Sequence, residues 1–223
     1  MPRSTQKRPY HHGDLRPALL LAVRELIAEH GIESLSLREC ARRAGVSWSA
    51  PGHHFGDKTG MLTAFAIEGF AALTAHMEKR RDAAATLLEA AAAVGAGYLE
   101  FALKFPEYFR VMFRAELLNE RDAAYQAASS KAFGVLESSI RACQPAQGIN
   151  EDAHSHQRCL LAWSVVHGFA TLVLEGAIAG TGRTAKTRLK IGMEIGQDLL
   201  RLLGPALFPA PSKSLAPLIQ QRL

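Results

Sequence analysis

Cysteine is scarce in this chain of 223 residues: Cys40, Cys143 and Cys159 are the only three, and they lie far apart. An odd, scattered set does not suggest a disulfide framework and suits a reducing cytosol. The chain also lacks a run of about 20 uncharged apolar residues, the length that crosses a bilayer as a helix. No apolar segment follows the basic first residues, as it would in a secretory signal. We therefore expect a cytoplasmic protein outside the membrane.

The residue patterns of common enzyme sites are also missing. There is no glycine-rich phosphate loop, no strand-turn-helix segment around a serine, and no pair of carboxylates beside a histidine in a supporting context. The adjacent His53 and His54 would point about 100° apart on a helix, so they are poorly placed to chelate one ion. The sequence predicts no enzyme, no metal site and no cofactor.

Positive charge is in slight excess. The net charge is +5 and the pI is near 9.3, which permits an anionic partner without identifying one. Residues 1–13 contain Arg3, Lys7 and Arg8 and no acid. Such an arm either contacts nucleic-acid phosphates or is a disordered, solvated terminus, and the sequence leaves both interpretations open.

The periodic segments repeat at helical spacing, and none alternates convincingly as a strand. We expect an all-α protein of about nine helices. Asp14 is the expected N-cap of the first helix, which ends at Gly31, and Ser36 with Glu39 predicts a capping box for the second. A longer helix begins at Asp57. Further helices are expected near 84–104, 106–117, 120–143, 150–179 and 184–203, with Asn150 and Thr184 as caps and Gly204-Pro205 as the final stop.

We divide the chain into four regions, and the motifs described below give the two middle regions their expected roles. The regions are a basic disordered arm at 1–13, a helix-turn-helix DNA-binding domain at 14–60, a ligand-binding and dimerisation domain at 61–204, and an irregular tail at 205–223.

Two short helices separated by Gly45-Val46-Ser47 predict a helix-turn-helix. Gly45 supplies the positive φ of the turn, Ser47 is expected to cap the second helix, and Pro51 is tolerated in its first turn. The second helix of such a unit enters the DNA major groove by its N-terminal part. Hydroxyl groups there bond base edges or phosphates, and Trp48 suits a thymine methyl or the sugar-phosphate wall. The predicted DNA-contacting set is Arg38, Ser47, Trp48, Ser49, Gly52, His53, His54, Lys58 and Thr59.

This part of the chain resembles the TetR family of bacterial transcriptional regulators. The residues that carry the resemblance are Ser36-Leu37-Arg38-Glu39-Cys40-Ala41-Arg42-Arg43-Ala44-Gly45-Val46-Ser47, His54-Phe55-Gly56-Asp57-Lys58 and Met61-Leu62. The resemblance implies that Lys58 faces a DNA phosphate at a helix N-terminus. It also marks one departure, because the family usually has a DNA-contacting tyrosine where this chain has Gly52. Glycine removes that contact and destabilises the helix by about 1 kcal/mol relative to alanine.

The rest of the chain predicts a ligand-binding region. Residues 98–113 concentrate aromatic side chains around Pro106, and Trp163-x-x-x-His167-Gly168 resembles the WHG-type C-terminal domain of some TetR-family proteins. Core packing alone explains these aromatic residues equally well. If these residues surround a cavity instead, the cavity would suit a small apolar or aromatic effector with one polar group that bonds the His167 imidazole. The predicted ligand-binding set is Tyr98, Phe101, Phe105, Phe109, Met112, Phe113, Trp163 and His167.

The interior glycines Gly168 and Gly176 suggest close approach by a helix or ligand, and Gly192-x-x-x-Gly196 suggests close helix packing in water, with a dimer interface as one option. The helices near 150–179 and 184–203 are expected to form a four-helix bundle with their symmetry mates. Their apolar surface is predicted from Leu160, Leu161, Leu189, Ile195, Leu199 and Leu202.

We therefore expect a homodimeric, ligand-responsive repressor that binds a near-palindromic double-stranded DNA operator. The alternatives are a helical carrier or enzyme with a weakened DNA-binding module, and a DNA-binding protein without an effector.

Overall fold

The structure is a computed structural model that describes residues 15–146, 155–178, 180 and 184–208. Every regular element among these residues is a helix, so the all-α prediction is confirmed. The predicted number of helices is also confirmed in this part of the chain: there are nine α-helices and one short 3-10 helix. Asp14 and Asn150, the predicted caps, and the arm at 1–13 lie outside the described residues.

Three helices form the N-terminal part. They are α1 (Leu15–His30), α2 (Leu37–Ala44) and α3 (Ala50–Phe55). The predicted ends at Gly31 and Gly45 are confirmed, because both glycines have the positive φ values, 77° and 69°, at which a helix stops without strain. The apolar stripe of α1 is buried against α2, α4 and α6. Its fully buried members are Leu19, Leu20, Ala22, Val23, Leu26 and Ile27.

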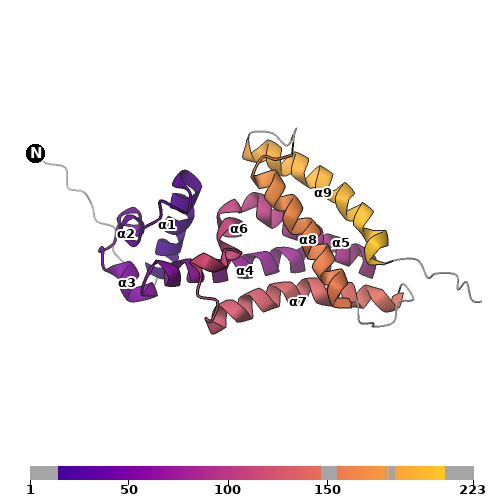
Figure 1. Ribbon diagram of the computed structural model, residues 1–223, viewed down its shortest axis with the longest axis horizontal. Coiled ribbons are helices and arrows are strands. Elements are labelled where there is room, and N and C mark those ends of the chain that lie inside the picture. Colours follow the sequence, from indigo (N-terminus) through magenta and orange to yellow (C-terminus); the bar gives the residue numbers. More distant parts are fainter. Residues whose placement is uncertain (1–14, 147–154, 179, 181–183, 209–223) are drawn as a thin grey trace, which may run out of the picture.

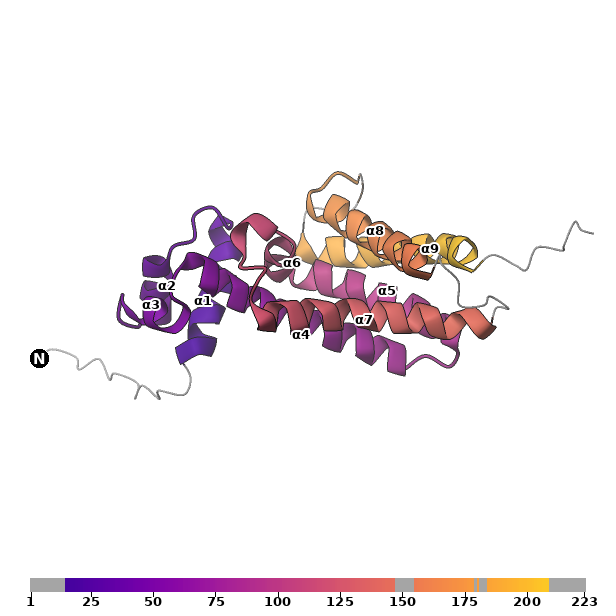
Figure 2. The ribbon, with the colours of Figure 1, turned by 60° about the horizontal axis from the view of Figure 1, so that its bottom comes forward.

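The C-terminal part is built around α5, which packs against α4, α7, α8 and α9. Its helices are α4 (Lys58–Asp82), α5 (Leu87–Lys104), α6 (Pro106–Met112), α7 (Ala123–Ala146), α8 (Ser155–Leu174) and α9 (Ala185–Leu207), with the 3-10 helix η1 (Ala115–Leu117) after α6. The long α4 joins the two parts, since it continues from the N-terminal helices into the bundle (Figures 1 and 2). The N-terminal helices therefore lie at one end of the molecule.

Side-chain caps set several helix starts. Asp57 accepts a hydrogen bond from the Gly60 N–H at 2.8 Å, and Thr86 with Glu89 forms a complete capping box at α5. Thr184 caps α9 as predicted. The capping box predicted at α2 is only half present: Ser36 accepts from the Glu39 N–H, but the Glu39 carboxylate bonds Arg42 instead.

Several other helix boundaries were predicted wrongly. Helix α6 ends at Met112 and α8 ends at Leu174, before the predicted ends at 117 and 179. Helix α3 begins at Ala50 rather than at Ser47, and the 47–49 segment forms a turn in which Ser47 Oγ accepts from the Ser49 N–H at 3.3 Å. Helix α9 runs through Gly204-Pro205 to Leu207. The proline removes only one hydrogen bond there, and the helix ends within a turn, so packing of Leu203 and Leu207 in the core outweighs the loss.

The interior glycines also differ from expectation. Apart from the chain neighbours and the helix's own backbone, no described residue lies within 4 Å of a Cβ built at Gly168. Gly176 is a left-handed residue after α8, with φ of 72°. By contrast, Gly192 and Gly196 face Leu103 and Leu99 of α5, where an added Cβ would lie 2.8 and 2.6 Å from the leucine methyl groups. The Gly192–Gly196 pair therefore packs inside the subunit and not across a dimer interface.

Two helices, α4 and α8, are long and apolar enough to cross a membrane by length and composition alone. Both contribute side chains to the core, and core helices of water-soluble proteins commonly have this composition. The finding is therefore weak support for a membrane span.

Candidate functional site

The turn between α2 and α3 is closed by its backbone. Gly45 N–H bonds the Arg42 carbonyl at 3.3 Å, and Val46 N–H bonds the Ala41 carbonyl at 3.0 Å. Ala41 is buried, and Pro51 is the buried residue of α3, so the two short helices meet through small side chains. Burial, together with the negative charge of the nearby Glu39 carboxylate, raises the pKa of the Cys40 thiol to about 11, so the thiol stays protonated.

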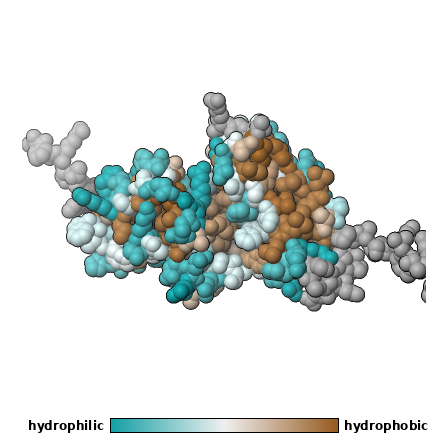
Figure 3. Space-filling model, viewed as in Figure 1, coloured by the Kyte–Doolittle hydropathy of each residue, from teal (hydrophilic) through white to brown (hydrophobic). Residues whose placement is uncertain are grey.

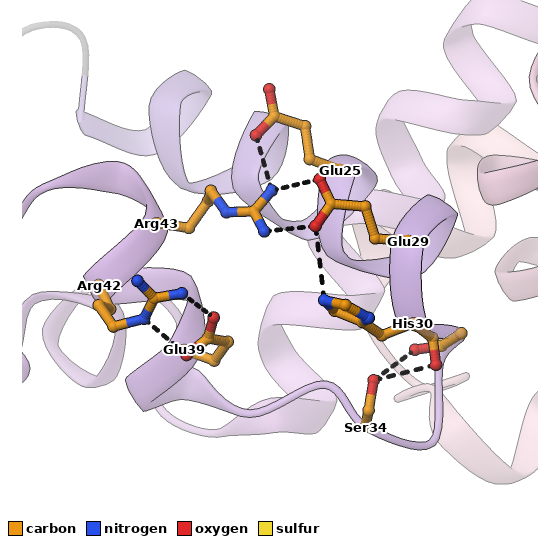
Figure 4. A network of polar contacts seen from close by, with 8 residues as sticks. Glu25, Glu29, His30, Ser34, Glu39, Arg42 and Arg43 are labelled. Atoms are coloured by element: carbon orange, nitrogen blue, oxygen red, sulfur yellow. Dashed lines mark hydrogen bonds and ion pairs between the residues drawn. The ribbon is translucent and has the colours of Figure 1, made fainter.

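An ion-pair network holds α2 against α1 (Figure 4). The Arg43 guanidinium of α2 bonds both Glu29 oxygens, at 2.8 and 2.5 Å, and Glu25 at 3.3 Å. The hydrogen bond from Arg43 holds the pKa of the Glu29 carboxyl below its usual value. The Arg43 guanidinium therefore supports the helix-turn-helix, and its charge is compensated.

The turn before α3 and the last turn of α3 itself present polar and aromatic side chains to solvent. Trp48 is 80% exposed, and Ser47, His53 and His54 are also exposed. The Ser47 and Ser49 hydroxyls lie 2.7 Å apart. The His54 ring lies 6.3 Å from the ring of Phe55, and the His54 side chain remains exposed. A surface of this kind offers donors, acceptors and one large ring to a groove.

Two cations flank this surface. Lys58 is the first residue of α4, after the N-cap Asp57, and Arg38 is exposed in the first turn of α2. No described residue forms an ion pair with either side chain, whereas Arg42 and Arg43 are both bound by carboxylates. Thr59 is exposed beside Lys58. The helix N-terminus adds a partial positive charge at Lys58, which favours a phosphate there.

A cavity of about 1710 Å³ lies between α4, α5, α7, α8 and α9. It opens to the surface, since exposed residues such as Leu160 and Arg201 line it. Four members of the predicted ligand-binding set line the cavity: Tyr98, Phe113, Trp163 and His167. Most other lining side chains are apolar, so the site suits a ligand that is itself largely apolar.

Three polar groups meet in the cavity wall. The Trp163 indole N–H donates to the Tyr98 hydroxyl oxygen at 3.3 Å, and that hydroxyl is 2.8 Å from His167 Nδ1. Burial lowers the pKa of the His167 imidazole and raises that of the Tyr98 hydroxyl, which favours the neutral form of both groups.

The other four predicted residues do not line the cavity. Phe101 and Met112 are fully buried in the core, and Phe109 lies behind His167 with its ring centre at 5.0 Å. Phe105 packs on the His76 ring of α4. These residues fill space, as the core-packing interpretation held.

Sequence reasoning missed most of the cavity wall. The missed residues include Phe70, Leu73 and Met77 of α4, Tyr125 and Leu136 of α7, and Leu200 and Leu203 of α9. Their sequence signal is an apolar residue at helical spacing, which is identical for a cavity wall and a filled core.

No group of three or more His, Cys, Asp or Glu side chains in the described part of the chain is arranged to hold a metal ion.

Comparison with known proteins bears on both parts of the chain. The family model described as "Bacterial regulatory proteins, tetR family" matches residues 19–65, and the model described as "Tetracyclin repressor-like, C-terminal domain" matches residues 91–194. No curated protein matches the chain.

Among solved structures, a protein of unknown function from Rhodococcus sp. RHA1 is 30% identical, with a TM-score of 0.70; the match covers 89% of this chain and 100% of that one. PfmR, a TetR family transcriptional regulator from Thermus thermophilus, is 19% identical, with a TM-score of 0.61 and coverage of 82% and 97%. The regulator FadR from Bacillus subtilis, solved in complex with stearoyl-CoA, is 16% identical, with a TM-score of 0.65 and coverage of 84% and 96%.

The N-terminal family model covers the helix-turn-helix and the start of α4. The C-terminal model contains part of the cavity wall, including Trp163 and His167. The chain therefore belongs to the TetR family of bacterial regulatory proteins and is a transcriptional regulator with an N-terminal DNA-binding domain.

Proposed function

We propose that this regulator is a cytoplasmic, ligand-responsive repressor that binds a near-palindromic operator as a homodimer. The observation that carries the proposal is the separation of two surfaces. The exposed start of α3 lies at one end of the molecule, and the cavity lies among the helices of the other end (Figure 1). DNA and a small ligand have separate places to bind, as a ligand-controlled switch requires.

The proposed dimer surface is an apolar face of α8 and α9. Leu161, Val165, Gly168 and Leu172 follow one another at helical spacing along α8, with Leu161 43% and Leu172 47% exposed. Leu202 of α9 is 77% exposed, and Ile195 and Leu199 lie on the same side of that helix. Figure 3 shows a broad apolar area over these two helices. Apolar patches of this extent mark association surfaces in soluble proteins.

The link between cavity and DNA-binding end is the segment after α6. Phe113 lines the cavity, and the next residue, Arg114, bonds Glu33 of the loop after α1 at 3.1 Å. The Asn119 N–H bonds Thr63 of α4 at 2.9 Å. A ligand that moves Phe113 would shift both contacts, and with them the spacing of the two α3 helices in the dimer. The ligand lowers operator affinity to the extent that it binds the dimer with the altered α3 spacing more tightly than the dimer with the DNA-binding spacing.

Lys58→Ala tests the DNA-binding surface. It should weaken binding to all duplex sequences and reduce the slope of log affinity against log salt by about one, because one phosphate contact is lost. The measurement is fluorescence anisotropy with DNA from upstream of the protein's own gene, across a salt series. Lys79→Ala, at the opposite end of the same helix, is the matched control and should change neither quantity. An unchanged salt slope for Lys58→Ala would remove this residue from the interface.

Gly52→Tyr should strengthen operator binding by roughly tenfold, through a more rigid helix and one added hydrogen bond to the DNA backbone. No described residue outside the neighbouring backbone lies within 4 Å of a Cβ built at Gly52, so the first atom of a larger side chain has room there. Gly52→Ala separates the two contributions, since it stiffens the helix without adding the aromatic contact. Weaker binding by Gly52→Tyr would mean that the backbone at Gly52 lies directly against DNA.

A further inference from the structure

We infer that the effector of this protein is an uncharged, largely apolar molecule with one hydrogen-bond acceptor, such as a ketone or ester carbonyl, and that His167 Nε2–H donates to it. The inference rests on the proposed function, because it assumes that the cavity binds the regulatory ligand. It adds the chemical class of that ligand and the atom that recognises it.

The hydrogen bonds around Tyr98 assign the proton of His167. An indole N–H only donates, so the Tyr98 oxygen accepts from Trp163. Tyr98 is only 6% exposed, and its own hydroxyl proton needs an acceptor; His167 Nδ1, at 2.8 Å, is the one among the described residues. The neutral imidazole then carries its proton on Nε2. Tyr98 is thus a positioning residue that sets the tautomer of His167.

The Nε2–H group is free to bind a ligand. Among the described residues that are not fully exposed, every side-chain nitrogen and oxygen except Arg188 Nε either has a hydrogen-bond partner or is accessible to solvent. His167 lines the cavity, and its Nε2 has no described hydrogen-bond partner, so this nitrogen is solvent-accessible. Rings of Phe113 and Phe109 lie 4.7 and 5.0 Å from the imidazole and limit its rotation. The donor is therefore held in place among apolar neighbours.

The charges along the cavity disfavour an anionic ligand. Three carboxylates line it, Glu89, Glu120 and Glu137, and of these Glu137 is paired with Arg141 at 3.0 Å. Its one Lys or Arg side chain among the described residues is Arg201. The Arg201 guanidinium already bonds Asp198 at 2.8 Å. A carboxylate or phosphate ligand would lose its hydration shell on binding, and no unpaired cation in the cavity would compensate its charge. Such desolvation of a charge costs several kcal/mol in proteins. A neutral acceptor avoids this cost and still satisfies the imidazole N–H.

Three molecules of similar shape provide the test: benzophenone carries a carbonyl, diphenylmethane carries none, and diphenylacetate carries a carboxylate. Isothermal titration calorimetry measures their binding to the full chain. Benzophenone should bind roughly tenfold more tightly than either of the others, the effect of one hydrogen bond within an apolar site.

Variants at the donor separate recognition from packing. His167→Leu should abolish the preference for benzophenone over diphenylmethane, whereas His167→Gln should keep it within about threefold, because the glutamine amide N–H replaces Nε2–H. His156→Leu, at an exposed position of the same helix and outside the cavity lining, is the control and should not change the preference. In ¹⁵N spectra of histidine-labelled protein, His167 should be the Nε2–H tautomer, and Tyr98→Phe should produce a mixture of tautomers.

Several results would overturn the inference. Equal binding of benzophenone and diphenylmethane rejects the Nε2–H donor, and tighter binding of diphenylacetate rejects the neutral class; in both cases the cavity still binds ligands. If none of the three binds, the cavity fails as a site for this class of molecule. The proposed function fails separately, if the wild-type protein without any ligand does not bind operator DNA.

Discussion

Gly60→Ala should abolish operator binding while leaving the helices of the C-terminal part folded. An alanine Cβ at this position would lie 2.0 Å from the carbonyl oxygen of Phe55 and 3.2 Å from its carbonyl carbon. The obstacle is backbone and not a side chain that could rotate away. It is also held, because the Phe55 carbonyl accepts a hydrogen bond from the Asp57 N–H at 3.0 Å. Relief therefore requires α3 to move relative to α4.

The cost of this clash is about 3 kcal/mol, the upper end of the range for overpacked sites. A displacement of α3 would relieve most of this clash. The proposed DNA-binding surface around α3 would then no longer fit the major groove of the operator. Anisotropy with operator DNA measures the loss, and circular dichroism shows whether the helices remain. Gly52→Ala is the matched control, since nothing lies within 4 Å of its Cβ, and it should bind DNA at least as well as the wild type. Normal operator binding by Gly60→Ala would show that the α3–α4 junction is more plastic than its geometry indicates.

Gly168→Arg should convert the proposed dimer to monomers and lower operator affinity by about 100-fold or more. Within the subunit the added Cβ has room, because no described residue outside the helix's own backbone and the chain neighbours lies within 4 Å of it. In the proposed dimer, Gly168 lies between the exposed leucines of α8, so an arginine would bury an unpaired charge in an apolar interface. Each subunit would then bind its half-site alone. In the dimer, binding of one subunit holds the second α3 at high effective concentration near its own half-site, and the monomer loses this advantage.

Sedimentation velocity measures the oligomeric state of Gly168→Arg, and anisotropy measures its affinity for the operator. Gly134→Arg, on α7, is the matched control, because its Cβ position is equally open within the subunit and it lies outside the proposed face. That control should remain dimeric and bind DNA normally. If Gly168→Arg remains a dimer at micromolar concentration, the face formed by α8 and α9 is not the interface.

The sequence alone determined the local features of this protein. The helix ends at Gly31 and Gly45 and the caps at Asp57 and Thr184 depend on backbone conformation and on side chains within a few residues, so they can be read from the order of residues. The helix-turn-helix follows from the same local rules together with its motif. The ligand-binding and DNA-contacting roles of individual residues remain predictions.

Only the tertiary structure decided which apolar residues surround empty space and which fill the core. Phe101 and Phe113 have the same chemistry and lie in the same aromatic segment, yet one is buried in the core and the other lines the cavity. Gly192 and Gly168 are both helical glycines, but only Gly192 has α5 packed against it. Helix α9 continues past Pro205 because Leu207 packs in the core. Each of these differences depends on residues far away in the chain, and periodicity along one helix contains no information about what faces it.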